Sequence, residues 1–420
     1  MKKKIYFLFC ILFIIVVCIS TFLMKKEKEN EISKTETNIP KGIGIHISGI
    51  PSEHEFQLIK QAGFKYARFD LAWTLIENDK GEYDFDNSGF DLLVQRMSKY
   101  DIKPYFILAY SNSLYEKKRS IVTEDGRKAF SEFVNEATKR YKGKNAIWEI
   151  WNEPNLPYYW QDQPSFNEYV KLVETIAPII KNNDSSGVVL GPAVSGISGE
   201  SLDWFEQVFQ QGILNQIDAV SVHLYRYTAP ETVSVDYPNL SSLIGKYTNH
   251  DVPIISGEWG YYVENSSDKE NAELLQAQNI VRMLLVNTIN DIPLSIVYEW
   301  KNSGIDIENK HDNYGLFWSE GKPKKSYDAL KVYAEVLDEY SFEKRIHIGQ
   351  PNDYILKFAN AKGKEILVFW TTDGEHNTSI NYPSGKGELV AMLGNKKEII
   401  WNNKQINLSL SQSPSYIIID

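Results

Sequence analysis

Eight short runs of β-forming residues alternate with helical patterns, and this alternation constrains the fold more than any other feature of the chain. The runs cover residues 42–47, 65–70, 103–109, 146–152, 187–190, 217–223, 253–257 and 294–299. Helical patterns fill the gaps, at residues 52–62, 130–141, 167–180, 272–287 and 327–337. Eight β-then-α units predict an α/β protein with a (β/α)8 TIM barrel rather than an open doubly wound sheet.

Local signals support this interpretation. Ser52 and Glu55 can form a capping box at the start of the first helix, and Gly63 can end it. No glycine-rich phosphate fingerprint follows the first β-forming run, which argues against a dinucleotide-binding sheet.

The pattern of apolar and polar residues changes after residue 340, where short predicted strands of alternating character are separated by turn residues. We therefore expect the barrel over residues 40–340 and a small C-terminal β-sandwich over residues 341–420. Trp370 and Trp401 allow two interpretations of the sandwich, a carbohydrate-binding module or a module packed on the barrel wall. We favour the second.

The first 26 residues predict a signal-anchor or a signal peptide, because an apolar run over residues 5–23 is flanked by lysines on both sides. No small-x-small cleavage site follows, which favours a retained membrane anchor over secretion after cleavage. Residues 27–39 are polar and predict a spacer. The remaining chain is then extracytoplasmic, and since Cys10 and Cys18 both lie in the leader it can form no disulfide.

Charge and histidine spacing limit the partners. Beyond residue 28 the chain carries 39 basic and 54 acidic residues, a formal charge of −15 that argues against a nucleic-acid partner. The seven histidines show no paired zinc-ligand spacing. We expect no metal and no other cofactor.

Two glutamates stand at the ends of predicted strands. Residues 147–155 read IWEIWNEPN, a buried strand that stops where Pro154 cannot continue the hydrogen-bonded ladder, and Glu153 lies at its tip. Glu258 ends the seventh run in the same way. The carboxyl ends of barrel strands meet at one mouth, so the two carboxylates should face each other, as cleavage of a glycosidic bond requires.

These motifs resemble those of the clan A glycoside hydrolases, most closely family 39 and next family 5, over roughly residues 40–420. The resemblance implies a retaining enzyme with Glu153 as acid/base and Glu258 as nucleophile. Such carboxyl groups stand about 5 to 5.5 Å apart, one protonated and one ionised. Other substrate-binding roles implied by the resemblance fall on Arg68 and Tyr225 beside the nucleophile, Asn152 at the sugar 2-hydroxyl, His223 near the acid/base, and Trp300 as the aromatic floor beneath the sugar.

The pattern departs from the clan after the third strand, where a common histidine is missing and Tyr110 or Asn112 could replace its contact. Trp160, shortly after the acid/base, is a further candidate for sugar binding. Glu149 lies about 13 Å deeper than Glu153 at four residues of strand rise, so we interpret it as a paired interior charge.

The resulting expectation is an extracytoplasmic glycosidase whose partner is an oligo- or polysaccharide, including an exopolysaccharide made by the cell itself. The alternative is a catalytically inert carbohydrate-binding scaffold of a polysaccharide export or surface assembly. The sequence identifies neither the sugar and its linkage nor endo or exo action.

Overall fold

The computed structural model describes residues 39–161 and 163–420, in which Pro40–Asp420 form one compact unit. The predicted leader and almost all of the spacer lie outside the described residues. Within the described ranges, no helix combines the length and apolar character needed to cross a bilayer.

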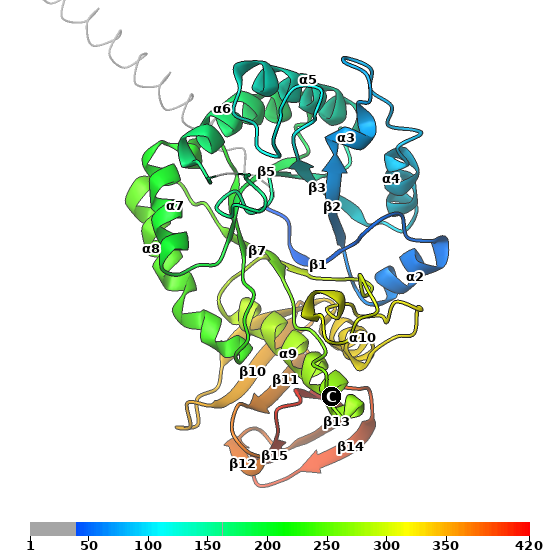
Figure 1. Ribbon diagram of the computed structural model, residues 1–420. Helices are drawn as coiled ribbons and strands as arrows, with labels where there is room; N and C mark the ends of the chain where they lie inside the picture. The colour runs from blue at the N-terminus through cyan, green and yellow to red at the C-terminus, as the bar shows by residue number, and fades with distance from the viewer. Residues whose placement is uncertain (1–38, 162) are drawn as a thin grey trace, which may run out of the picture. The chain divides into compact units, whose positions relative to one another are not determined.

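Eight parallel strands close into a barrel in sequence order, with β1 pairing β8, so the barrel prediction is confirmed (Figure 1). The strands are β1 (Gly42–His46), β2 (Tyr66–Ala72), β3 (Lys103–Ala109), β4 (Ile147–Ile150), β5 (Val188–Ser195), β6 (Ala219–His223), β7 (Ile254–Trp259) and β8 (Leu294–Val297).

Helices surround this barrel (Figure 1). Apolar side chains of the strands and of the helices share one core. They are α2 (Glu53–Gln61), α3 (Trp73–Ile76), α4 (Phe90–Lys99), α5 (Glu124–Tyr141), α6 (Phe166–Asn183), α7 (Glu200–Gln210), α8 (Tyr237–Tyr247), α9 (Lys269–Ile289) and α10 (Lys325–Leu337). The predicted capping box of Ser52 and Glu55 is present at the start of α2.

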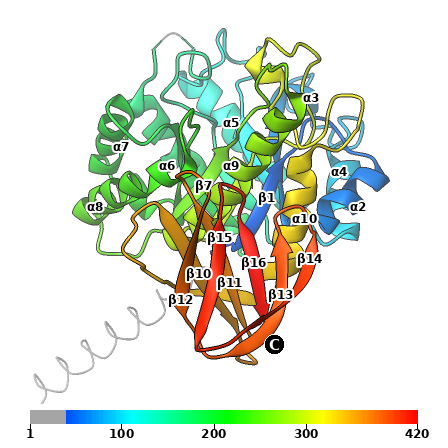
Figure 2. The same cartoon turned by 90° about the horizontal axis from the view of Figure 1, so that it is seen from below.

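Antiparallel strands follow the barrel and form two sheets. The strands are β9 (Tyr340–Arg345), β10 (Asp353–Asn360), β11 (Glu365–Thr371), β12 (His376–Asn381), β13 (Gly385–Ala391), β14 (Lys396–Trp401), β15 (Gln405–Leu410) and β16 (Ser415–Ile419). Six of them form one sheet in the order β14-β13-β16-β11-β10-β9, and β12 pairs β15. Figure 2 shows these strands gathered below α9 and α10.

Alternation along β11 shows how the sheets are held. Leu367 and Phe369 face the smaller sheet and share its core, whereas Val368 and Trp370 belong to the large core that includes the barrel. The indole nitrogen of Trp370 donates to Glu231 Oε1 of the barrel at 2.7 Å. The C-terminal sheets therefore pack on the barrel, and Trp370 is part of that contact rather than an exposed sugar platform.

Candidate active site

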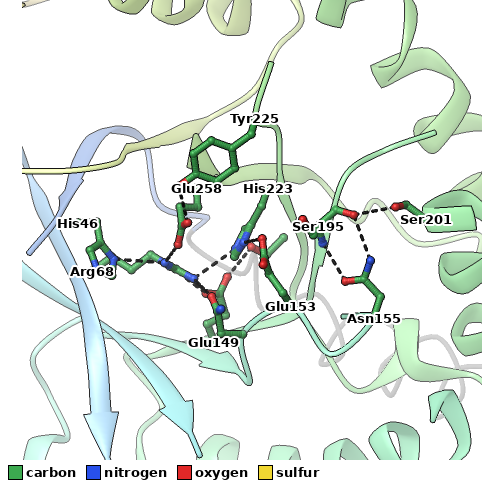
Figure 3. A network of polar contacts seen from close by, with 12 residues as sticks. His46, Arg68, Glu149, Glu153, Asn155, Ser195, Ser201, His223, Tyr225 and Glu258 are labelled. Carbon is green, nitrogen blue, oxygen red and sulfur yellow. Dashed lines mark hydrogen bonds and ion pairs between the residues drawn. The ribbon is translucent and has the colours of Figure 1, made fainter. Parts of the chain in front are cut away.

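Polar side chains from several barrel strands converge at the carboxyl ends of the strands (Figure 3). His46 and His223 are the last residues of β1 and β6, and Arg68 and Glu258 lie within β2 and β7. Glu153 follows β4 by three residues. The cluster is thus assembled by closure of the barrel from segments far apart in the sequence.

Arg68 is the centre of this cluster and is fully buried. Its Nε and Nη2 atoms donate to Glu149 Oε1 at 3.0 and 2.7 Å, and its Nη1 atom donates to Glu258 Oε2. One buried guanidinium therefore neutralises an interior carboxylate and also binds the carboxylate at the mouth.

Arg68 is also connected to Glu153, through His223. Nη2 lies 2.9 Å from Asn152 Oδ1 and 3.2 Å from His223 Nε2. A guanidinium can only donate, so His223 Nε2 is the acceptor and the ring hydrogen is on Nδ1. His223 Nδ1, 3.0 Å from Glu153 Oε1, then donates to that oxygen and leaves Glu153 Oε2 available to carry a proton.

Glu149 is a paired interior charge, as the sequence predicted. In addition to Arg68, it accepts hydrogen bonds at Oε2 from Tyr105, at 2.6 Å, and from Ser221. Only glycine fits at position 257 beside Glu149, because a Cβ atom there would lie 2.1 Å from Ser221 Oγ and 3.2 Å from Glu149 Oε2. Gly257, which precedes Glu258, thus leaves room for Glu149, the carboxylate that holds Arg68.

The surroundings of Glu258 keep its carboxyl group ionised. Burial by itself raises its pKa, but the Arg68 charge, with smaller contributions from His223, His46 and the Tyr225 hydroxyl, lowers it from 4.5 to about 2. The Tyr225 hydroxyl donates to Glu258 Oε1 at 2.6 Å. Both Glu258 oxygens thus accept a hydrogen bond while the side chain remains 12% exposed.

The Glu153 backbone is held in an uncommon conformation. Its φ of 44° lies in the left-handed region, and its N–H donates to Ala193 O of β5 at 3.0 Å. The loop continues through Asn155, whose side chain pairs with the backbone of Ser195 at 3.0 and 3.1 Å (Figure 3). These bonds to β5 fix the turn that presents Glu153.

Two site residues are absent from the sequence prediction. His46 Nδ1 lies 3.3 Å from Arg68 Nη1. Burial lowers the pKa of His46 to about 4, although the Glu258 charge acts in the opposite direction, so the ring is neutral at neutral pH. Tyr298 follows β8, and its ring centroid lies 5.0 Å from that of His46 and 6.1 Å from that of Tyr225. A survey of polar and aromatic residues at every strand end would have found both.

The structure contradicts the role predicted for Trp300. Its side chain is 3% exposed, packs on Phe317 and Tyr327, and donates through Nε1 to Glu55 Oε1 at 3.3 Å. Residues of β8 alternate in direction, but the chain leaves the sheet after Val297 and turns Trp300 away from the carboxylates. Tyr298 is the aromatic side chain that β8 brings to the site.

Trp160 is also wrongly predicted. It is 1% exposed, and its ring centroid lies 5.1 Å from that of Trp151 and 6.2 Å from that of Tyr169. The loop after Glu153 folds this indole into the core because Trp160 N bonds back to Leu156 O at 2.9 Å. Trp160 therefore supports the loop and offers no surface to a sugar.

Asn112 and Tyr110, the two residues proposed to replace the missing histidine, lie in different surroundings. Asn112 is 2% exposed and donates to Glu77 O at 2.7 Å, so it serves the loop itself. Tyr110 is partly buried, and its ring stacks at 6.0 Å on Tyr159, the tyrosine whose pKa is raised by burial and then by Glu153 and Glu258. Tyr110 is thus the one of the two that lies on the wall near the carboxylates.

Among residues 39–161 and 163–420, no group of three or more His, Cys, Asp or Glu side chains is arranged to hold a metal ion. The cluster can nevertheless perform acid–base and nucleophilic chemistry. It combines an ionised carboxylate, Glu258, with a second carboxyl group, Glu153. The Arg68 guanidinium contacts Glu258 directly and also contacts His223, which binds Glu153.

Comparisons with known proteins show which family and which solved structures the chain resembles. The family model described as Cellulase (glycosyl hydrolase family 5) matches residues 26–303. A β-xylosidase from Geobacillus stearothermophilus is 25% identical over an alignment of 292 residues, and the match covers 64% of this chain and 52% of the relative. The chain thus spans about half the length of that curated relative.

Solved structures share the fold. A family 39 glycoside hydrolase from Bacteroides cellulosilyticus WH2 has a TM-score of 0.79 at 22% identity, covering 91% of this chain and 81% of its own. A monomeric β-xylosidase from Caulobacter crescentus CB15 has a TM-score of 0.67 at 15% identity, covering 90% of this chain and 95% of its own.

Proposed function

Because the chain belongs to the Cellulase (glycosyl hydrolase family 5) family, within clan A of the glycoside hydrolases, we propose that it is a retaining glycosidase. Membership confirms the clan A resemblance, although the matching model is that of family 5, which the motifs placed second to family 39. The proposed substrate is an oligo- or polysaccharide with O-glycosidic bonds. The observation that carries this proposal is the network through Arg68 that joins Glu258 to Glu153.

The geometry supports a double displacement. In the first step a Glu258 oxygen attacks the anomeric carbon and forms a glycosyl–enzyme bond, while Glu153 gives its proton to the departing oxygen. In the second step Glu153 takes a proton from water, the water oxygen bonds to the anomeric carbon, and Glu258 is released. The Arg68 charge keeps Glu258 ionised for attack, and His223 orients Glu153.

The scaffold alternative has less support. A protein that only binds sugar has no need for a carboxylate whose pKa is held near 2 beside a second carboxyl group. No feature among the described residues favours loss of turnover over catalysis.

A hydrolysis screen tests the proposal. The protein should release reducing ends from at least one member of a panel of xylans, glucans, mannans and secreted exopolysaccharides, and mass spectrometry of the products would identify linkage and endo or exo action. Glu258→Gln should abolish release while the variant remains folded, as far-UV circular dichroism would show. Binding without release by the wild type would refute the proposal and favour the scaffold.

We also propose that the enzyme acts outside the cytoplasm, anchored by its N-terminal segment. The apolar run over residues 5–23 with flanking lysines, and the confinement of both cysteines to that segment, support this location. Cell fractionation provides the test, since the anchored protein should stay with the membranes after a high-salt wash. Recovery of a shortened protein from the medium would favour cleavage and secretion.

A further inference from the structure

Asp70 lies at the barrel mouth beyond the residues that the proposed mechanism uses. It is two residues after Arg68 on β2, so both side chains face the barrel interior. Arg68 is fully buried, whereas Asp70 is exposed. An inward-facing strand residue can be exposed only where the barrel opens, so Asp70 lies about 7 Å above Arg68 at the entrance.

The Asp70 carboxylate has no hydrogen-bond or ion-pair partner in the described part of the chain. Other carboxylates near the barrel mouth receive several hydrogen bonds from the protein. Glu77, for example, accepts from the Trp73 indole at 2.6 Å, from Gly81 N at 2.7 Å and from the Tyr115 hydroxyl at 2.5 Å. Asp70 differs from Glu77 in this respect, and because it is exposed its acceptor sites are open to a ligand.

A nearby cation does not satisfy Asp70. The Arg119 guanidinium lies over the Tyr110 ring at 3.8 Å and over the Tyr158 ring at 5.1 Å. Asp70 is accessible to solvent but surrounded by protein atoms at the mouth, and this desolvation raises its pKa to about 6, against the opposing charges of Arg68 and Arg119. Asp70 is thus partly enclosed, mostly ionised at neutral pH, and unpaired.

We propose that Asp70 is a specificity-determining residue that accepts hydrogen bonds from neighbouring hydroxyl groups of the sugar ring bonded to Glu258. This inference rests on the proposed function and deepens it. Arg68 donates to Glu258, and Asp70 is the next inward-facing residue on the same strand, so a ring held at Glu258 comes within reach of Asp70. A carboxylate with open acceptor sites suits a pair of adjacent hydroxyls.

The charge of Asp70 also defines the class of sugar. A ring bearing its own carboxylate at this position would face a like charge in a partly enclosed site, which is unfavourable. The preferred ring is therefore neutral, with unsubstituted hydroxyl groups next to one another. Uronic acid rings should be poor substrates in this position.

The test compares the wild type with Asp70→Asn and Asp70→Ala on the aryl glycoside that the wild type cleaves best. We expect kcat/KM to fall at least tenfold in both variants. Asp101→Asn, which changes an exposed carboxylate paired with Lys60, is the matched control and should retain wild-type rates. A change of less than twofold in the Asp70 variants would overturn the inference.

Deoxy substrates separate direct contact from a long-range effect on Glu258. Wild-type enzyme should lose rate on the 3-deoxy or the 4-deoxy glycoside, and Asp70→Asn should lose little more on that same analogue. If Asp70→Asn loses the same factor on the parent and on every deoxy analogue, the residue acts through charge alone and the inference is wrong.

Failure of the proposed function is distinguishable from failure of this inference. If the wild type cleaves no glycoside, calorimetry with neutral oligosaccharides of the same panel replaces the rate measurement. A tenfold weaker affinity of Asp70→Asn would then support the contact even though hydrolysis is refuted. Equal affinities would refute the contact.

Discussion

Replacing Arg68 with Met should move the acid limb of the pH–rate profile by more than two pH units. In the wild type the pKa of Glu258 is about 2, although burial favours the protonated acid, and Arg68 is the strongest of the groups that lower it. Without that charge the pKa should rise above its usual value of 4.5. The difference corresponds to about 3 kcal/mol of interaction that favours the ionised carboxylate.

The sign of the pH effect follows from the direction of this shift. Glu258 is active when ionised, so kcat/KM is lost as the pH falls through its pKa. In the wild type, the loss of kcat/KM caused by protonation of Glu258 should therefore begin only below about pH 3, separate from the loss expected as Asp70 is protonated near pH 6. In Arg68→Met, the midpoint of the loss caused by Glu258 should lie above pH 4.5. The same depressed pKa stabilises the wild-type fold above pH 4.5, and this contribution is lost as the pH falls toward 2.

A dinitrophenyl glycoside is the appropriate substrate, because its leaving group departs without a proton and kcat/KM then depends on the ionisation of Glu258 and not on the protonation of Glu153. Arg68→Met leaves Glu149 as an uncompensated buried charge, so the double variant with Glu149→Gln is the control. An acid limb that stays below pH 4 in both variants would show that Arg68 does not set the ionisation of Glu258.

Three further predictions follow from the contacts of the site and of the sandwich. Glu153→Ala should lose activity on substrates with poor leaving groups, and azide should restore its turnover of an activated substrate, giving a glycosyl azide of retained configuration; absence of this rescue would count against the acid/base role. Tyr225→Phe removes the 2.6 Å hydrogen bond to Glu258 and should lower kcat/KM by the equivalent of about 1.5–3 kcal/mol, with unchanged rates counting against a role for that bond. Trp370→Phe removes the bond to Glu231 and should lower the free energy of unfolding in a denaturant titration by about 1.5–3 kcal/mol, whereas no loss would show that this contact adds nothing to stability.

The sequence by itself determined the barrel and the positions of the two glutamates. Both depend on local patterns, since each strand is a short run of β-forming residues, and Pro154 and Gly260 mark the ends of the two runs that carry the glutamates. Glu153 and Glu258 could be found because a carboxylate directly after such a run has little choice of direction. The N-terminal leader remains a prediction.

Only the tertiary structure decided which side chains meet. Trp300 and Trp160 were chosen for their chemical type, but their directions depend on how the chain leaves the sheet, and both are packed into the core. His46 and Tyr298 reach the site because closure of the barrel brings β1 and β8 together. The pairing of Arg68 with Glu149 and Glu258 joins residues 81 and 190 positions apart, and no local pattern encodes such a contact.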